Sequence, residues 1–209
     1  MAPKQLMLLG PPGAGKGTQA KMLAERSGVS HLSTGDILRD EVSRGTALGK
    51  RAEETMKRGD LVSDKLVIDM IRDRVTSCDG FVLDGFPRTV AQAEALASFA
   101  SLDLVINISL SREEVIRRLS ARRICEGCGR ISNLLFDPPE KAATCDRCGG
   151  RLIQRDDDQP SVIENRFDVY VASTAPLITH YGTQGILREV DGTRPPADVH
   201  QSIVALLAG

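Results

Sequence analysis

Short aliphatic runs alternate with longer segments of helical periodicity along most of this chain. The runs at residues 5–9, 81–83 and 104–108, with a weaker one at 186–190, are bounded by Gly or Asp, which is typical of buried parallel strands. The HLST segment that begins at His31 is interpreted as one more strand. Helical patterns occupy the intervals Lys16–Arg26, Asp36–Arg58, Asp64–Val75, Val90–Ala100, Arg112–Arg123, Val162–Tyr181 and Ala197–Leu207. The alternation predicts an α/β fold, an open parallel sheet with helices on both faces.

Two segments interrupt this rhythm. Residues 34–63 are helical and charged, and they separate the HLST strand from the next core helix. Residues 124–160 are rich in Gly, Cys, Asp, Arg and Pro, show no helical period, and are too long for an ordinary loop in a compact domain. We therefore expect a core of residues 1–33, 64–123 and 161–209 with two inserted units.

Length and composition narrow the class of protein. A chain of 209 residues suits one sizeable core, and 27 basic against 28 acidic residues provide no overall field for a nucleic acid or a membrane surface. Small-molecule partners are favoured. No run approaches the roughly 18 apolar residues of a membrane helix, and the N-terminal MAPKQLMLLGPP does not have the form of a signal peptide. We expect a cytoplasmic protein.

The stretch LLGPPGAGKGTQA, residues 8–20, follows a predicted strand and precedes a predicted helix. It matches the phosphate-binding pattern G-x-x-x-x-G-K-[ST] through Gly10, Gly15 and Lys16, but Gly17 stands where a hydroxyl is expected and Thr18 comes one place late. Glycines let successive backbone N–H groups point at phosphate oxygens, and Lys16 is expected to bridge the terminal phosphates. The alternative is a tight Gly-Pro turn with a solvated lysine.

Asp84 is the candidate for holding magnesium. With Gly17 in the hydroxyl position the ion lacks one protein ligand, but Mg²⁺ readily keeps waters through which a carboxylate can hold it. Asp84 ends the buried run FVLDG, where a parallel sheet presents acids to a ligand at its carboxyl edge. The alternative is an aspartate that caps a helix or a turn.

Four of the five cysteines form two C-x-x-C pairs, Cys125 with Cys128 and Cys145 with Cys148. Each pair is followed directly by Gly, an arrangement that predicts a tetrahedral zinc site, and four protein ligands make the role structural. Free thiols or two disulfides are the alternatives. The segment has little apolar material for a core of its own and therefore needs a metal to hold it together; its best core candidates are Ile131, Leu134, Leu135, Phe136, Leu152 and Ile153.

The motifs together resemble one family. GPPGAGKGTQA, LSTGDILRD, GDLVSD, VLDGFPRTVAQAE, ARRICEGCG and RDDD occur in the order and at the separations found in adenylate kinases, and the chain looks like the long form whose lid binds zinc. The resemblance extends from Lys4 to about Gly192. It implies a P-loop NTPase-like core, a monophosphate-binding region at 34–63, a zinc-stapled lid at 124–160, and a monomer that converts MgATP and AMP into two ADP.

The resemblance also implies roles for individual residues. The phosphate-contacting cations are Lys16, Arg39, Arg88, Arg118, Arg122, Arg155 and Arg166, of which Lys16, Arg88, Arg122, Arg155 and Arg166 are expected to be catalytic. The ATP side comprises Gly13, Ala14, Gly15, Lys16, Gly17, Thr18, Arg118, Arg122, Ile131, Ser132 and Arg194. The AMP side comprises Thr34, Arg39, Asp60, Leu61, Val62, Gly85, Phe86, Pro87, Arg88, Gln92, Arg155 and Arg166. Asp84 is expected to hold Mg²⁺ through water, and the four paired cysteines to hold Zn²⁺.

The residues themselves support these roles to different degrees. Gly85 and Pro87 make a rigid turn that aims Arg88. Arg118 and Arg122 are four apart in a predicted helix and could meet one ligand, although a solvated basic face explains them equally well. Gln92 lies one turn after Arg88, and its paired donor and acceptor could recognise an adenine edge, whereas a lone helical Gln is usually just solvated.

Two functions are alternatives to this interpretation. A related kinase could act on UMP, CMP or GMP, although Gln92 and Thr34 favour AMP. A zinc-ribbon protein could bind nucleic acid under nucleotide control. A net charge of −1 and only seven aromatic residues, five Phe and two Tyr, argue against the nucleic-acid-binding hypothesis.

Overall fold

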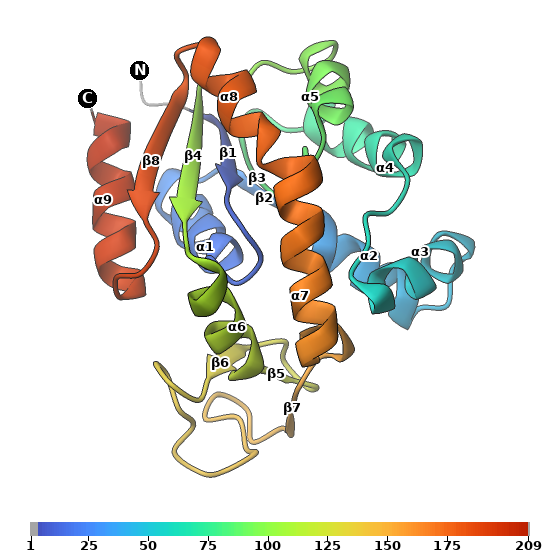
Figure 1. Cartoon of the computed structure of the whole chain (residues 1–209), viewed down its shortest axis with the longest axis vertical. Coiled ribbons are helices and arrows are strands. Elements are labelled where there is room, and N and C mark those ends of the chain that lie inside the picture. The colour runs from blue at the N-terminus through green and yellow to red at the C-terminus, as the bar shows by residue number, and fades with distance from the viewer. Residues whose placement is uncertain (1–3, 209) are drawn as a thin grey trace.

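The structure, a computed structural model, describes residues 4–208. Within this part, five strands form one sheet in the order β2 (Ser30–Ser33), β3 (Phe81–Asp84), β1 (Gln5–Leu9), β4 (Leu104–Ser109) and β8 (Leu187–Asp191). Every neighbouring pair is parallel, so the carboxyl ends of all the strands meet at one edge (Figure 1). The predicted parallel sheet is confirmed.

Alternate side chains of the central strands enter two separate cores. Met7, Leu9 and Val105 join the core on one face, and Leu6, Leu8 and Ile106 join the core on the other. Such two-sided burial explains why these strands read as continuous aliphatic runs without polar alternation.

Helices cover both faces, as predicted. The first face packs against α4 (Asp64–Thr76), α5 (Val90–Ala97) and α8 (Pro176–Thr183). The second packs against α1 (Lys16–Ser27) and α9 (Pro196–Ala208), which also contact each other. Helix α5 ends at Ala97, three residues before the predicted end.

The predicted helix over residues 36–58 is two helices, α2 (Thr34–Ser43) and α3 (Ala47–Arg58). Gly45 has a φ of 63°, a left-handed conformation that ends the first helix. Thr46 then caps the second by accepting a hydrogen bond from the Gly49 amide at 3.0 Å. A Cβ on Gly49 would lie 2.1 Å from the Glu41 carbonyl oxygen, so the two helices pack at backbone contact.

The single helix predicted over 162–181 is one helical path with an internal change of winding. It comprises α7 (Pro160–Val169), a π-helical turn η2 (Tyr170–Thr174) and α8, which begins at Pro176. Proline lacks an N–H and suits the first position of a helix, so a new α-helical segment starts there.

The helix predicted over 112–123 is wrong at its end. Helix α6 (Arg112–Ser120) stops three residues early, and Arg122 begins strand β5 (Arg122–Cys125). Ile124 pairs with Ile131 on one side and with Ile153 on the other. Because of this pairing the segment forms a strand, although its charge pattern continues that of the helix.

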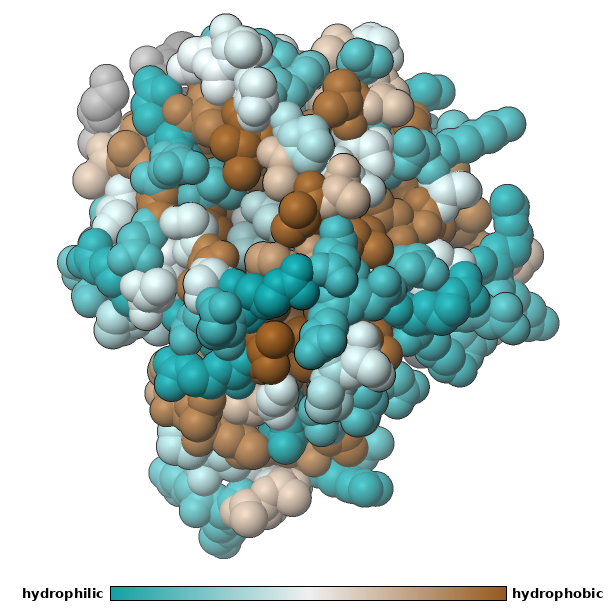
Figure 2. Space-filling model, in the orientation of Figure 1, coloured by the Kyte–Doolittle hydropathy of each residue, from teal (hydrophilic) through white to brown (hydrophobic). Residues whose placement is uncertain are grey.

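The cysteine-containing insert is a small antiparallel sheet in the order β6 (Ile131–Asn133), β5 and β7 (Leu152–Ile153), followed by a 3₁₀ turn η1 (Asp156–Asp158). Its predicted apolar core is only partly correct. Leu152 is buried with Cys125 and Cys145, whereas Ile131, Leu134, Leu135 and Phe136 are exposed. Figure 2 shows apolar side chains interspersed among polar ones over this lower end of the molecule.

Among residues 4–208, no helix combines the length and the apolar character that crossing a membrane requires.

Candidate functional site

The loop between β1 and α1 has the backbone that a phosphate cradle needs. Gly10, Gly13 and Gly15 have φ values of 140°, 80° and 88°, which side chains would strain. A Cβ on Gly10 would lie 2.3 Å from the Ile108 carbonyl oxygen. Gly15 is the N-cap of α1 and has no side chain with which to cap it, so the first amides of the helix can receive an anion.

Lys16 lies over this loop. Its Nζ donates hydrogen bonds to the carbonyl oxygens of Gly10 and Pro11, both at 2.8 Å. Burial lowers the pKa of Lys16 to about 8; Asp84 opposes the shift, and the arginines Arg88, Arg166 and Arg122 add to it. A cation that is costly to charge in the free protein is poised to gain from a bound polyanion.

Asp84 and Gly17 face each other, which explains the missing hydroxyl of the loop. A Cβ built on Gly17 would lie 3.2 Å from Asp84 Oδ2, closer than an ordinary van der Waals contact. The carboxylate at the end of β3 thus lies beside the position where a serine or threonine stands in the standard pattern. A hydrated Mg²⁺ fits an oxygen donor of this kind.

A cavity of about 570 Å³ opens at the carboxyl edge of the sheet, and its volume is typical of small-molecule and cofactor sites. Lys16, Asp84, Arg88, Arg122 and Arg155 all line it. The further predicted residues in its wall are Gly13, Gly15, Gly17, Thr18, Arg39, Leu61, Gly85, Pro87, Arg118, Ile131, Ser132 and Arg166.

A smaller cavity of about 70 Å³ adjoins it, because Arg39, Arg88 and Arg166 line both. The smaller cavity adds predicted residues from the 34–63 region and from α5, namely Thr34, Asp60, Val62 and Gln92. The two cavities therefore meet at three guanidinium groups.

Arg88 is held firmly at this junction. Its Nε donates to the Gly85 carbonyl oxygen at 2.8 Å, its backbone N–H donates to Gln92 Oε1 at 2.7 Å, and its own carbonyl accepts from Thr174 Oγ1 at 2.9 Å. Thr34 Oγ1 donates to the same Gly85 carbonyl at 2.8 Å. Burial lowers the pKa of Arg88 to about 10, with Arg166 acting in the same direction.

Two aspartates from η1 neutralise part of the arginine cluster, and the sequence reasoning assigned them no role. Asp158 is completely buried and accepts two hydrogen bonds from Arg122, at 2.6 and 2.8 Å, and one from Arg166 at 3.2 Å. Burial alone would raise the pKa of Asp157, but Arg166 and Arg122 hold it below its ordinary value. The segment RDDD places both near Arg155, but their partners Arg122 and Arg166 lie elsewhere in the sequence, so the segment does not reveal these contacts.

Arg118 and Arg122 do not share a helical face, contrary to the prediction. Arg118 lies in α6, donates to Glu114 Oε1 at 2.6 Å, and its guanidinium carbon is 5.2 Å from the centroid of the Phe136 ring. Arg122 lies in β5 and pairs with Asp158. Both nevertheless line the main cavity.

Phe136 is a wall residue of the main cavity rather than part of a lid core. Phe136 is 47% exposed, and its ring lies beside the guanidinium groups of Arg117 and Arg118. An exposed ring next to a guanidinium plane offers a stacking surface for a heterocyclic base. The signal in the sequence was an apolar run, LLF, in an insert too small to bury it.

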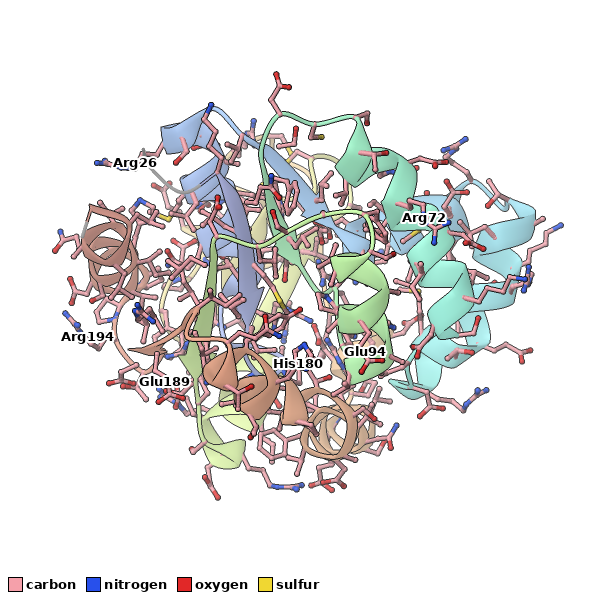
Figure 3. All side chains as sticks on the ribbon, turned by 90° about the horizontal axis from the view of Figure 1, so that it is seen from above. Arg26, Arg72, Glu94, His180, Glu189 and Arg194 are labelled. Carbon is pink, nitrogen blue, oxygen red and sulfur yellow. The ribbon has the colours of Figure 1, made fainter. Side chains whose placement is uncertain are left out.

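Three predicted residues lie outside the cavity walls. Phe86 is fully buried in the core, and the amide of Ala14 donates to the Pro11 carbonyl within the loop. The side chain of Arg194 donates to Ser202 on α9 and lies at the periphery (Figure 3). This last segment approaches the site through Pro196, which lines the main cavity, and through a hydrogen bond from Arg118 Nη2 to the Thr193 carbonyl at 3.2 Å.

The four paired cysteines form a compact cluster. Their Sγ atoms lie within 4.8 Å of one another, with Cys125 and Cys148 at 3.4 Å and Cys128 and Cys145 at 3.7 Å. A tetrahedron of thiolates around zinc has edges of about 3.8 Å. The fifth cysteine, Cys78, lies elsewhere, on the loop after α4.

The backbone around the cluster repeats one turn twice. The backbone N–H groups of Gly129 and Gly149 donate to the carbonyl oxygens of Cys125 and Cys145, respectively. The backbone N–H groups of Cys125 and Cys145 in turn donate to the carbonyl oxygens of Arg130 and Gly150. A hydrogen bond from the Cys128 amide helps to lower the pKa of Cys125 to about 7, toward the thiolate that binds metal. A Cβ on Gly150 would lie 2.9 Å from Cys125 Sγ, so glycine is needed over the cluster. These features fit a structural metal.

Comparisons with known proteins agree with this geometry. A family model described as adenylate kinase matches residues 8–186. The chain is 50% identical to an adenylate kinase of Methanocella arvoryzae over 211 aligned residues, covering 97% of this chain and 98% of that protein. It is 48% identical to one of Archaeoglobus fulgidus, with 97% of each chain covered, and 47% identical to one of Lachnospira eligens, with 97% and 99% covered.

Proposed function

Because this chain belongs to the adenylate kinase family, it is a phosphotransferase, and we propose that it transfers a phosphoryl group reversibly between MgATP and AMP, giving two ADP. The observation that supports this reaction best is the junction of the two cavities. Arg39, Arg88 and Arg166 line both, so a phosphoryl group could be held by the same cations on either side of the transfer. Positioning and charge stabilisation are what such a transfer demands of a protein.

The larger cavity is assigned to ATP. Amides of Gly13, Gly15, Gly17 and Thr18 would receive its phosphates, with Lys16 over the terminal ones. Arg122 and Arg155 approach from the lid side, and Arg155 Nε is buried without a protein partner among the described residues. An unpaired buried donor supports a role in gripping an incoming phosphate oxygen.

Phe136 and Arg118 are assigned to the adenine of ATP, together with Ile131 and Ser132. The smaller cavity is assigned to AMP, with Thr34, Arg39, Gln92 and the backbone of residues 60–62 around it. Asp84 would hold Mg²⁺ through its waters. The ion would neutralise negative charge on the phosphates during transfer.

Zinc is assigned to the cysteine cluster as a structural ion. It would hold together a lid whose apolar side chains are largely exposed, so that Arg122 and Arg155 move onto ATP as one body. Closure of this kind, which excludes water from the reaction, is a standard property attributed to adenylate kinases. We propose 34–63 and 124–160 as the two mobile units on a core formed by the rest of the chain.

The cellular setting is a further proposal. Four clustered thiols that bind a metal suit a reducing compartment, which supports the cytoplasm. The groups assigned to the reaction line two adjoining cavities and need no residue from a second subunit, which supports a monomer.

Substrate choice tests the proposed function directly. Initial rates of ADP formation from MgATP should be highest with AMP when AMP, GMP, CMP and UMP are compared at equal concentration. Equal or higher rates with a pyrimidine monophosphate would contradict the assignment. Tight, salt-sensitive binding of an oligonucleotide with no phosphoryl transfer would replace it with the nucleic-acid-binding alternative.

Removal of the lid metal should affect stability more than chemistry. After chelation, we expect faster amide hydrogen exchange across residues 124–160 and a lower Tm, because the insert loses the ion that organises it. Turnover measured in the cold should change little. The Cys128→Ser variant should reproduce the loss of protection and Cys78→Ser should not; immediate loss of activity in the cold with unchanged exchange would instead indicate a catalytic metal.

Nucleotide affinity should fall as the pH rises above about 8. In the free protein the pKa of Lys16 is lowered from 10.5 to about 8, so its proton begins to leave there. A bound phosphate favours the charged ammonium, so binding above that pH takes up a proton and weakens by up to about tenfold per pH unit.

Calorimetric titration with ATP between about pH 7 and about pH 9.5 measures this effect, since the lowered pKa lies within that window. The Lys16→Arg variant, whose guanidinium stays protonated, should lose the dependence. A constant wild-type affinity over the window would show that Lys16 does not carry the interaction.

A further inference from the structure

The side-chain amide of Gln92 is held between two partners that cannot exchange roles. Its Nε2 donates to Asp64 Oδ1 at 2.7 Å, and its Oε1 accepts from the backbone N–H of Arg88 at 2.7 Å. A carboxylate can only accept and a backbone N–H can only donate. The orientation of the amide is therefore determined by chemistry.

A rotation of the amide by half a turn would break both bonds. It would place Oε1 against the Asp64 carboxylate and Nε2 against the Arg88 N–H, an acceptor facing an acceptor and a donor facing a donor. Gln92 is only 2% exposed, so little water can reach the amide to replace the two lost partners.

Asp64 is itself fixed in place. It is the first residue of α4, and its Oδ2 accepts from Thr89 Oγ1 at 3.1 Å. The same Thr89 hydroxyl caps α5 by accepting from the Gln92 backbone N–H at 3.2 Å. The starts of α4 and α5 are thus joined around the Gln92 amide by one aspartate and one threonine.

The held amide retains one unused position on each atom. Nε2 has a second N–H and Oε1 a second lone pair, and within residues 4–208 neither has another protein partner in hydrogen-bond distance. Gln92 lines the smaller cavity, so this remaining donor and acceptor are what the amide can offer a ligand there.

Purine bases differ at the edge that such an amide recognises. Adenine presents an amino donor at position 6 and an acceptor at N1, whereas a 6-oxopurine presents an acceptor at position 6 and a donor at N1. An amide with both ends free could rotate to suit either base. An amide held in one orientation matches only one of them.

We propose that Asp64 is a specificity-determining residue that selects 6-aminopurine over 6-oxopurine monophosphates by preventing rotation of the Gln92 amide. Asp64 acts as a positioning residue, since it reaches the base only through Gln92. The inference rests on the proposed function, because it assumes that the smaller cavity receives the base of the monophosphate.

The test is the Asp64→Asn variant assayed with AMP and with IMP. IMP differs from AMP at the recognised edge and adds no group at position 2. The introduced asparagine keeps the shape of the side chain but can turn its own amide to donate or to accept, so Gln92 gains freedom to rotate. The ratio of kcat/KM for AMP to that for IMP should fall by about tenfold, through a higher KM for AMP and a lower KM for IMP.

A matched control is Asp69→Asn on the same helix. Asp69 is exposed, and its substitution removes the same charge from α4 without touching Gln92. The ratio of its kcat/KM for AMP to its kcat/KM for IMP should equal that of the wild type. Thermal unfolding of both variants separates altered selectivity from loss of fold.

The outcomes separate the two proposals. A wild-type protein that does not phosphorylate AMP contradicts the proposed function before any variant is made. A wild type that prefers AMP, with a ratio unchanged in Asp64→Asn, overturns the role of Asp64 alone. An equal fall in ratio in Asp69→Asn also overturns it, because the effect would then come from charge and not from the held amide.

Discussion

The Arg88→Ala variant is expected to retain its fold and to lose about a thousandfold in kcat/KM for AMP. Arg88 stands at the junction of the two cavities and is aimed by hydrogen bonds of its backbone and its Nε. Under the proposed function, its remaining guanidinium nitrogens grip the group in transfer. Steady-state rates and the Tm measure the two parts of the prediction.

Two companion variants sharpen the Arg88 result. Arg88→Lys keeps the charge but loses the planar fork, and it should recover only a small part of the activity. Arg26→Ala removes an exposed arginine at the periphery of the molecule, visible in Figure 3, and should behave as the wild type. Near-normal turnover in Arg88→Ala would contradict the role assigned to the junction.

The Lys16→Met variant should lose at least about a hundredfold in kcat and yet unfold at the same or a higher temperature. Keeping a charged ammonium at this position destabilises the free protein, since burial lowers the pKa of Lys16 to about 8. Methionine fills similar space without a charge. The expected gain or constancy in stability together with lost activity is typical of a residue kept for function.

Thermal unfolding and ADP formation, measured on the same preparation, test the Lys16 prediction. Lys50→Met, at an exposed position of α3, is the matched control and should leave both unchanged. If Lys16→Met were as active as the wild type, the loop would not be a phosphate site; if it were unfolded at room temperature, the lysine would be structural.

Most of the sheet could be predicted because its signals are local. Residues 5–9 and 104–108 are buried on both sides, so each reads as an unbroken aliphatic run, and they form β1 and β4. The phosphate loop could be predicted because its glycines are required by backbone conformation at Gly10, Gly13 and Gly15. The cysteine spacing predicted the cluster in the same way.

The errors occurred where the partners of a segment are distant in the chain. Arg122 continued a helical pattern, but its segment pairs with strands that lie further along the insert. Phe136 was assigned to a core because it is apolar, whereas the insert is too thin to cover it. Asp158 was given no role because nothing local reveals that two arginines, one before the insert and one after it, converge on a single buried carboxylate.

The amino-acid sequence by itself determined the strands of the main sheet, most of the helices that cover it, where the phosphate loop lies and which side chains can bind a metal, because each of these depends on residues close together in the chain. Only the tertiary structure decided that Arg39, Arg88 and Arg166 line both cavities. It also decided that the Asp84 carboxylate lies beside Gly17 and that Asp64 accepts a hydrogen bond from the amide of Gln92. These relations are hydrogen bonds and contacts between strand ends and helix starts. The chain brings such groups together only when the sheet has formed and its helices have packed on both faces.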